Sequence, residues 1–429
     1  MAHIAETATN VSAAPRLIPA LDLSTAPGFR RRVDSVPRNA PFDGVVTRHH
    51  ASVCEIEEAE WNRLFPDACE DWGYFRGIEL SGSSHFSFSA VAAYKGGRLI
   101  AAAPVFRLDY RLDMTLPDGL KAVGDWLARV APRLVKVPVL GLGSPMTEEC
   151  PIGFDGSLDE HCRTNAVAAL VDALEEHAKA EKVKILALKD VTDRDAQWAS
   201  ATLDRKGFAR MASLPVAVLP LPFATFEDYL RSMPSKKRSD IRKKLRGAAD
   251  VKVEFRDDVE DVYDEILALY RATRANRKAS YEAFDEVPED YFREVMARSG
   301  GKARALLFRL DGRLVSFCLF MVEKDRVIGK FVGMDYKVAR AHNLYFLNWM
   351  TVVRYCIENG IPNLQTGQTT YAVKVRLGCK LKRSWIYFKY TGRVLGPLIR
   401  TLGPRFSFED VDPELGELGE KAVYLAPEA

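Results

Sequence analysis

Short apolar segments separated by turn residues occur in the same order in both halves of the chain. In the first half, apolar positions recur from Phe86 to Tyr94 and again from Leu99 to Phe106, on either side of a Lys-Gly-Gly-Arg sequence. This arrangement is typical of a β-hairpin. In the second half, Asp-Gly and Lys-Asp turns separate the runs Ala303 to Leu310, Leu314 to Val322 and Val327 to Met334, which predicts an antiparallel meander.

Each group of strands is followed by an amphipathic helix and then by an apolar strand. The first helix is expected from Asn165 to Ala180, before a strand from Val183 to Leu188. The second is expected from Leu344 to Glu358, where Asn-Gly ends it in a left-handed cap, before a strand from Ile361 to Thr366. A short helix and one more strand follow in each half, at Arg194–Lys206 and Ser213–Leu221, and at Tyr371–Leu377 and Trp385–Tyr390.

The second half opens with further helical segments around a short strand. Helices are expected from Phe226 to Arg246, Glu260 to Arg277 and Pro288 to Arg298, with a strand from Val251 to Phe255. Two copies of this element order predict an α+β fold of two tandem domains, each a mixed, mostly antiparallel sheet flanked by helices. The expected boundaries are a flexible tail at 1–42, domains at 43–221 and 222–392, an insertion at 112–139 in the first domain, and a C-terminal extension at 393–429.

The composition excludes several classes of protein. With 47% hydrophobic and 28% charged residues, the 429-residue chain is neither disordered nor collagen-like, and it is long enough for two cores. Its seven cysteines contain no Cys-x-x-Cys spacing, which argues against a disulfide framework or a zinc ribbon. A net charge of +3 gives no overall field for DNA, and no apolar run reaches the roughly 20 residues of a membrane-spanning helix. We therefore expect a cytoplasmic protein without a secretory signal, a transmembrane segment or a metal site.

Two local motifs carry a resemblance to a known superfamily. The first is the basic segment Phe226–Arg246 before a short strand, and the second places Gly367, Tyr371, Lys374 and Gly378 after a strand of the second half. Together with the element order, these motifs resemble the GNAT superfamily, and more closely its tandem-domain branch of FemABX-like aminoacyltransferases and CelD/BioF-like acyltransferases. The resemblance implies two GNAT-like domains and an N-acyltransferase in which an amine attacks an activated thioester directly.

The resemblance also implies where the acyl donor binds. In GNAT domains the fourth and fifth strands splay apart to receive the acyl amide, and a glycine-rich turn at a helix N-terminus holds the pyrophosphate. Here the corresponding loop, Lys337 to Asn343, has no glycine, which leaves acyl-CoA, the phosphopantetheine of an acyl carrier protein and a charged tRNA open as donors. Each of these would be a co-substrate, with no tightly bound cofactor. The donor-binding residues expected from the resemblance are Lys337, Arg340, Asn343, Gly367, Gln368, Thr369, Lys374 and Arg376.

Acyl transfer to an amine needs a proton donor and a proton acceptor. Tyr371 stands where many GNAT enzymes place the tyrosine that protonates the leaving thiolate, although a tyrosine that only packs would give the same pattern. Asp335, after the last strand of the meander, and Glu323, at its central turn, are the candidate bases; His342 is similarly placed. No Ser/His/Asp or Cys/His constellation is recognisable in the sequence, which fits direct attack without a covalent intermediate.

The densest charge in the chain lies in the segment that is expected to open the second domain. Arg238, Arg242 and Arg246 form one stripe at helical spacing, suited to the phosphates of tRNA or coenzyme A, to an acidic carrier protein, or simply to solvent. This leaves two alternatives to thioester-dependent transfer: a tRNA-dependent aminoacyltransferase of FemABX type, and a non-catalytic binding module. The first domain lacks the pattern around Tyr371, and we expect it to support the site for a small-molecule amine acceptor.

Overall fold

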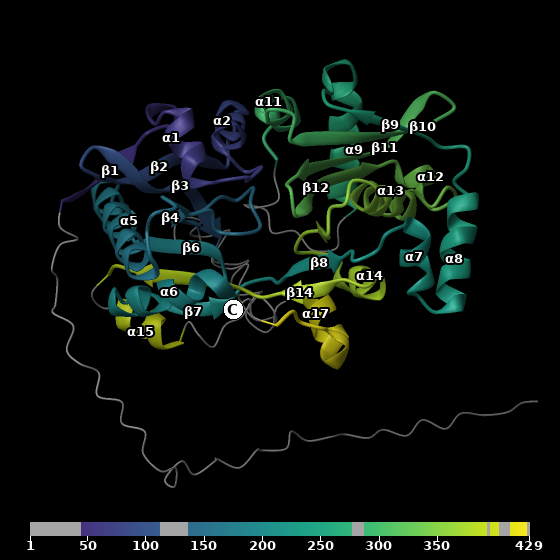
Figure 1. The fold of residues 1–429 in the computed structure, drawn as a ribbon. Helices are drawn as coiled ribbons and strands as arrows, with labels where there is room; N and C mark the ends of the chain where they lie inside the picture. Colours follow the sequence, from purple (N-terminus) through teal and green to yellow (C-terminus); the bar gives the residue numbers. More distant parts are fainter. Residues whose placement is uncertain (1–43, 112–135, 277–286, 393–394, 403–411, 427–429) are drawn as a thin grey trace, which may run out of the picture. The chain divides into compact units, whose positions relative to one another are not determined.

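The strands of the chain form two β-sheets, and helices pack against them (Figure 1). The structure is a computed structural model that describes residues 44–111, 136–276, 287–392, 395–402 and 412–426. The tail expected at 1–42, and most of the insertion expected at 112–139, lie outside the described residues.

The first sheet has eight strands within the described residues. Seven lie in the order β1-β2-β3-β4-β6-β15-β7, and β5 pairs with β3. Every pair is antiparallel except β4 with β6, and the predicted hairpin is confirmed as β2 and β3. The bounds are β1 Val45–His50, β2 Phe86–Lys95, β3 Arg98–Arg111, β4 Lys136–Leu142, β5 Gly153–Phe154, β6 Ile185–Thr192, β7 Ala209–Ala212 and β15 Ser384–Tyr390.

The second sheet has seven described strands, in the order β14-β8-β13-β12-β11-β10-β9. Again a single pair is parallel, β12 with β13, and the predicted meander is confirmed as β10, β11 and β12. The bounds are β8 Val216–Pro220, β9 Lys252–Arg256, β10 Ala303–Leu310, β11 Arg313–Val322, β12 Arg326–Met334, β13 Asn363–Gln365 and β14 Lys380–Lys382.

Position by position, the two sheets repeat one topology. In each sheet, four successive strands, β1 to β4 in the first and β9 to β12 in the second, are antiparallel to their neighbours, and the fourth pairs in parallel with the next strand across the sheet. One long helix lies in the connection between those parallel strands: α5 (Glu160–Ala180) between β4 and β6, and α13 (Leu344–Glu358) between β12 and β13. The predicted α+β fold of two mixed, mostly antiparallel sheets flanked by helices is confirmed.

The two sheets exchange one strand in each direction, which differs from the expected assignment. The sequence predicts Ser213–Leu221 in the first domain and Trp385–Tyr390 in the second. Instead, β8 pairs with β13 and β14 in the second sheet, and β15 pairs with β6 and β7 in the first. That assignment is therefore wrong for both strands.

The exchange follows from the short connections that precede the two strands. Only Arg383 separates β14 from β15, and only 213–215 separate β7 from β8. One extended residue cannot reverse the chain as a hairpin turn would, so β15 continues into the neighbouring sheet. The two crossing segments also bind each other, because the Ser213 amide donates to the Ser384 carbonyl at 3.0 Å.

The helices follow the predicted positions, with one correction. The segment Phe226–Arg246 is two helices, α7 (Phe226–Arg231) and α8 (Ser235–Arg246), because Pro234 has no N–H to donate and disfavours a helical conformation at Met233. The other bounds are α1 Glu58–Leu64, α2 Trp72–Leu80, α6 Asp193–Arg205, α9 Tyr263–Ala275, α11 Tyr291–Arg298, α12 Tyr336–Ala339, α14 Tyr371–Arg376, α15 Leu395–Leu402 and α17 Pro413–Leu418.

Apolar side chains from both halves share one hydrophobic cluster. It includes Tyr74 of α2, Tyr291 of α11 and Phe317 of β11, each at most 1% exposed. α2 lies close to α11 because it carries glycine at the contact: a Cβ on Gly73 would lie only 2.2 Å from the carbonyl oxygen of Arg298. The helices of the two halves are therefore packed directly against each other.

Part of the C-terminal extension covers an edge of the second sheet. The Leu381 amide of β14 donates to the Val423 carbonyl at 2.8 Å, and the Leu381 carbonyl accepts from the Leu425 amide at 2.8 Å. α17 packs against α14, whereas α15 packs on β15 and β7 in the first sheet. Pairing of an edge strand prevents its association with strands of other chains.

Candidate active site

β12 and β13 pair over three residues and then separate. Ile328 opposite Gln365 is the last pair, and beyond it the Thr366 amide donates to the Ala217 carbonyl of β8 at 2.8 Å. β12 continues to Met334 with β11 along one side. Within the described residues, no strand pairs with the other edge of β12 after Gly329, and the Met334 amide near its end donates to the Thr273 hydroxyl at 3.0 Å. The backbone groups between Gly329 and Met334 on this edge have no strand partner and can pair with a ligand.

A β-bulge lies where the two strands separate. Leu319 is opposite Phe331 and Phe320 is opposite Gly329, so Lys330 is an extra residue in β12. A bulge bends its strand and redirects the side chain of the extra residue. The splay that the resemblance implies is therefore present in the second sheet, with a lysine at its origin.

The loop after β13 turns at Gly367 and is fixed by Lys374. Gly367 has a φ of +85°, which glycine adopts without strain, and a Cβ there would lie 3.0 Å from Glu148 Oε1. Lys374 is buried, and its Nζ donates to the carbonyls of Thr366 and Gly367, the latter at 3.2 Å. This lysine therefore holds the loop beside the opened edge in place.

The other predicted donor-binding residues of this region lie around the same loop. Gln368 donates from Nε2 to the Leu214 carbonyl at 2.8 Å, which ties the loop to the segment that crosses between the sheets. Thr369 and Arg376 are exposed. Their binding of a donor stays a prediction.

Tyr371 lies in the core of the second half. It is 0% exposed, and its hydroxyl donates to the Pro215 carbonyl at 2.8 Å. This hydrogen bond anchors α14 to the segment before β8. The geometry supports a packing role, and transfer of the Tyr371 proton to a leaving thiolate stays a prediction.

The loop before α13 contains a left-handed residue although it has no glycine. Asn343 has a φ of +49° and immediately precedes the helix, and asparagine adopts this conformation more readily than most residues. The amides of the first helical turn, starting at Leu344, have no acceptor within the helix. Lys337 and Arg340 are exposed on the segment just before it. Cations and helix amides together suit an anionic group.

The predicted arginine stripe of α8 is partly engaged within the protein. Arg242 forms an ion pair with Glu227 of α7, and Arg238 donates to the Met233 carbonyl at 3.3 Å. Arg246 is exposed in the last turn. Contact between this stripe and a polyanion stays a prediction.

The two candidate bases lie beyond opposite ends of β12. Asp335 accepts from the Lys337 amide at 2.9 Å and pairs with Arg313 at 3.0 Å. Glu323 accepts from the Cys69 amide at 2.9 Å and pairs with Arg326 at 2.6 Å. Each carboxylate is thus engaged by one cation and one backbone amide, and the structure does not bring the two together.

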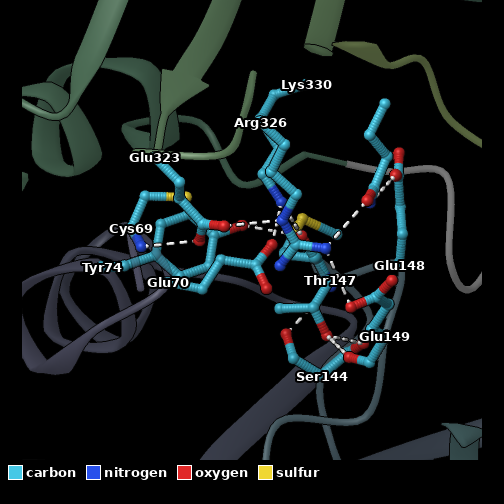
Figure 2. Close-up of polar contacts among 12 residues, drawn as sticks. Cys69, Glu70, Tyr74, Ser144, Thr147, Glu148, Glu149, Glu323, Arg326 and Lys330 are labelled. Atoms are coloured by element: carbon cyan, nitrogen blue, oxygen red, sulfur yellow. Dashed lines mark hydrogen bonds and ion pairs between the residues drawn. The ribbon is translucent and has the colours of Figure 1, made fainter. Parts of the chain in front are cut away.

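Charged side chains from the two halves of the chain meet at the start of β12 (Figure 2). Glu149, in the loop after β4, pairs with Arg326 and with Lys382, each at 3.0 Å. Figure 2 shows the Arg326 guanidinium lying between Glu149 and Glu323. Burial raises the pKa of Glu149, but Arg326 and Lys382 outweigh burial and lower the pKa to about 2. Glu149 is therefore ionised at neutral pH.

The bulge residue Lys330 forms a second ion pair in this cluster. Its Nζ contacts the Glu70 carboxylate and donates to the Met146 carbonyl at 3.2 Å. Burial is the largest single effect and lowers the pKa of Lys330, but Glu70, Tyr291 and Glu148 together outweigh it and the pKa is raised, so the ammonium stays charged. The same Met146 carbonyl accepts from the Tyr74 hydroxyl at 2.7 Å, which places the start of the splay against α2.

Sequence reasoning identified Glu323 in this cluster and missed the other carboxylates. Glu70, Glu148 and Glu149 lie in loops, where charged residues carry no periodic signal. One local signal was available, since Glu148 and Glu149 are the only charged residues between 137 and 154. Adjacent charges inside an otherwise uncharged segment favour burial with partners over a solvated loop.

A comparison with family models decides the superfamily of the second half. Residues 235–374 match the model for the acetyltransferase (GNAT) domain. The chain carries a GNAT domain. The resemblance stated from the motifs is confirmed, and the match extends from α8 into α14, so the GNAT domain contains the splayed strands and the bulge at Lys330.

Three solved structures illustrate what the chain is similar to. FemX is 14% identical, with a TM-score of 0.49, over 77% of this chain and 93% of that chain. A tandem GNAT protein from the clavulanic acid biosynthesis pathway is 14% identical, with a TM-score of 0.46, over 81% and 99%. L-PGS from Bacillus licheniformis is 10% identical, with a TM-score of 0.46, over 81% and 91%. A comparison with curated proteins gives no match.

Two further findings concern the residues that the structure describes. No helix among them is long and apolar enough to cross a membrane. No group of three or more His, Cys, Asp or Glu side chains among them could hold a metal ion.

Proposed function

We propose that the protein is an N-acyltransferase that moves an acyl group from an activated thioester to an amine. The opened edge of β12, with its bulge at Lys330 inside the GNAT domain, is the observation that carries this proposal. An extended thioester donor carries amide groups, which can pair with free backbone groups as a neighbouring strand would. The acyl end of the donor would then lie near Lys330 and Gly367, where polar side chains converge.

The opposite end of the donor would lie at the start of α13. Amides of the first helical turn and the cations Lys337 and Arg340 suit a phosphate of acyl-CoA or of a carrier-bound phosphopantetheine. Asn343 supplies the left-handed conformation that a glycine would otherwise provide at this turn. The absence of glycine from the loop therefore does not count against a phosphate donor.

Direct attack by the amine fits the state of the Cys379 thiol, which lies close enough to Lys374 to feel its charge. Cys379 follows α14, and burial raises the pKa of its thiol to about 12. A protonated thiol is a poor nucleophile, so formation of an acyl-enzyme at Cys379 is disfavoured at neutral pH. In the proposed reaction the amine nitrogen bonds to the thioester carbonyl carbon, the carbon–sulfur bond breaks, and the thiolate leaves and takes up a proton.

A donor panel tests the proposal. The purified protein is incubated with butylamine and with radiolabelled acetyl-CoA, palmitoyl-CoA, acyl carrier protein thioesters and aminoacyl-tRNA in turn. We expect amide product from at least one thioester. Binding of a thioester without turnover would favour the non-catalytic alternative, and neither binding nor turnover with any donor would overturn the proposal.

A tRNA-dependent aminoacyltransferase is the second candidate, and the surface of α8 favours it. Ile241 is the buried residue of this helix, whereas Lys236, Lys243 and Arg246 are exposed. Lys244 places its Nζ 3.7 Å from the centre of the Phe346 ring, so α8 lies beside the start of α13. Ribonuclease treatment separates the candidates, because it abolishes transfer from an aminoacyl-tRNA and leaves transfer from a thioester unchanged.

A further inference from the structure

A rigid loop of the first half presents one carboxylate to the splayed strands of the GNAT domain. The Thr147 carbonyl, next to Glu148, accepts from Lys189 Nζ at 3.0 Å, and the Thr147 hydroxyl donates to the Glu149 carbonyl at 2.9 Å. The Cys150 amide donates to the Asp190 carbonyl at 2.9 Å. These contacts fix the backbone on both sides of Glu148, so its side chain is preorganised.

The Glu148 carboxylate lies where β12 and β13 separate. Its Oε2 accepts from Gln365 Nε2 at 2.6 Å, and Gln365 Oε1 in turn accepts from Arg326 at 3.0 Å. This chain of bonds sets the orientation of the Gln365 amide and directs its N–H to Glu148. Oε1 lies 3.0 Å from the position that a Cβ on Gly367 would occupy, and that position is empty because the residue is glycine.

Glu148 differs from its neighbours in having an oxygen that the protein does not engage. Glu149, Glu323 and Glu70 are each bound to a cation. Among the described residues, no hydrogen bond or ion pair reaches Glu148 Oε1, and the residue is half-buried. A carboxylate oxygen in this setting can accept from a ligand without breaking an existing contact.

The charged groups that face Glu148 are already bound elsewhere. Lys330 of β12 lies near Glu148 and is held by Glu70. Lys374 of α14 has its Nζ 3.7 Å from the same empty position at Gly367, and it donates to two backbone carbonyls. The space at Gly367 is therefore bordered by one oxygen that can accept a hydrogen bond, Glu148 Oε1, and by lysines that already donate to other groups.

We propose that Glu148 binds the acceptor of the transfer reaction, a primary amine that arrives as an ammonium ion, and removes its proton. This inference rests on the proposed function and assigns the acceptor side of the same site. The ammonium donates to Oε1 and transfers one proton to the carboxylate. The neutral nitrogen attacks the thioester carbonyl carbon, the carbon–sulfur bond breaks, and the second nitrogen proton goes to the leaving thiolate. Glu148 then releases its proton to solvent.

Two probe amines separate this role from a structural one. Butylamine is protonated at neutral pH, whereas methoxyamine is neutral and needs no base before it attacks. We expect Glu148→Gln to reduce transfer to butylamine by about 10²-fold or more and transfer to methoxyamine by less than about fivefold. Glu148→Asp should restore part of the butylamine reaction, and Glu176→Gln, at an exposed glutamate of α5, should match the wild type.

Butylamine binding, measured by saturation-transfer NMR, gives a readout that does not need turnover. If the wild type transfers to neither amine, the proposed function is rejected. Weaker butylamine binding in Glu148→Gln than in the wild type would then still support Glu148 as the ammonium site. Equal butylamine binding and equal transfer in Glu148→Gln and wild type would overturn the inference and leave the proposed function standing. Equal loss with both amines, with thermal unfolding unchanged, would also overturn it, because a base is needed for butylamine alone.

Discussion

Glu149 and Arg326, which are 177 positions apart in the sequence, form an ion pair of 3.0 Å that joins the loop after β4 to the first residue of β12. Lys382 of β14 binds the same carboxylate at 3.0 Å. One side chain of the first half thus connects two strands of the second sheet. Removing one member of such a buried group leaves the remaining charges poorly compensated, so its contribution to folding is measurable.

Glu149→Gln is expected to lower the stability of the protein in a pH-dependent way. The folded pKa of Glu149, about 2, is below the ordinary 4.5 of an unfolded chain, so its stabilisation is present above about pH 4.5 and is lost as the pH falls toward 2. The variant should lose about 3 kcal/mol at neutral pH. The difference from wild type should shrink by about 2 kcal/mol between about pH 5 and pH 3, measured by urea unfolding.

The exposed Glu176→Gln serves as the control for this measurement, because Glu176 lies on the solvent side of α5. It should unfold like the wild type at every pH. A Glu149→Gln protein whose stability differs from wild type by the same amount at both ends of the range would contradict the assigned ion pair.

Two stacked histidines predict a second pH dependence at higher pH. The rings of His49 on β1 and His177 on α5 lie 3.6 Å apart at 16°. Burial is the main cause that lowers the pKa of His49, and the charges of His177 and His50 lower it further, against the opposite effects of Glu55 and Glu181. Burial is also the main cause that lowers the pKa of His177, where Glu181 acts against it and Arg107 adds a smaller decrease.

Both folded pKa values lie below the unfolded value near 6.5, so stability is full above about pH 6.5 and falls as the pH drops below it. His177→Gln removes one titrating group and the repulsion within the pair. The decrease in urea midpoint between about pH 7.5 and pH 5.5 should be smaller in the variant than in the wild type. An identical decrease in both proteins would show that the pair does not titrate as described.

The exchanged strands predict that neither half folds when the chain is cut between 221 and 222. A fragment ending at 221 lacks β15, whose Tyr387 is 0% exposed in the first sheet and whose hydroxyl lies 2.6 Å from Ser200 Oγ. Loss of a central strand removes backbone pairing on two sides and a buried aromatic ring. Fragment 42–221 should show no cooperative thermal transition by circular dichroism, whereas 42–221 joined by a flexible linker to 384–392 should regain one. Cooperative unfolding of the unmodified fragment would contradict the exchange.

Tyr371→Phe distinguishes packing from proton transfer at this position. Because its hydroxyl donates to the Pro215 carbonyl in a buried site, we expect a loss of about 1 to 2 kcal/mol in stability. The turnover number for acyl transfer should fall by less than about tenfold. A decrease of about 10² or more with the fold intact would restore Tyr371 as the proton donor, as the resemblance implies.

The element order, the two meander-like groups and the long helices were predictable because each depends on local periodicity and turn residues. The exchange of β8 and β15 was not, since both segments are apolar strands by any local criterion and their sheet is decided by the short connections that precede them. The position of Lys374 near the opened edge followed from its motif. The contact of Glu148 with Gln365 required the fold, because a loop carboxylate carries no information about a residue 217 positions away.

Hydrogen exchange of the β12 backbone tests the central claim most directly, since the account places the acyl donor along the edge that β13 leaves open. Amide exchange is measured by mass spectrometry with and without acetyl-CoA and palmitoyl-CoA, and peptides covering Lys330 to Met334 are compared with peptides of β10. The account predicts that a thioester donor slows exchange in the β12 peptides by about tenfold or more and leaves β10 unchanged. If the protein consumes either thioester but neither thioester changes amide exchange in β12, the proposed position of the donor is contradicted.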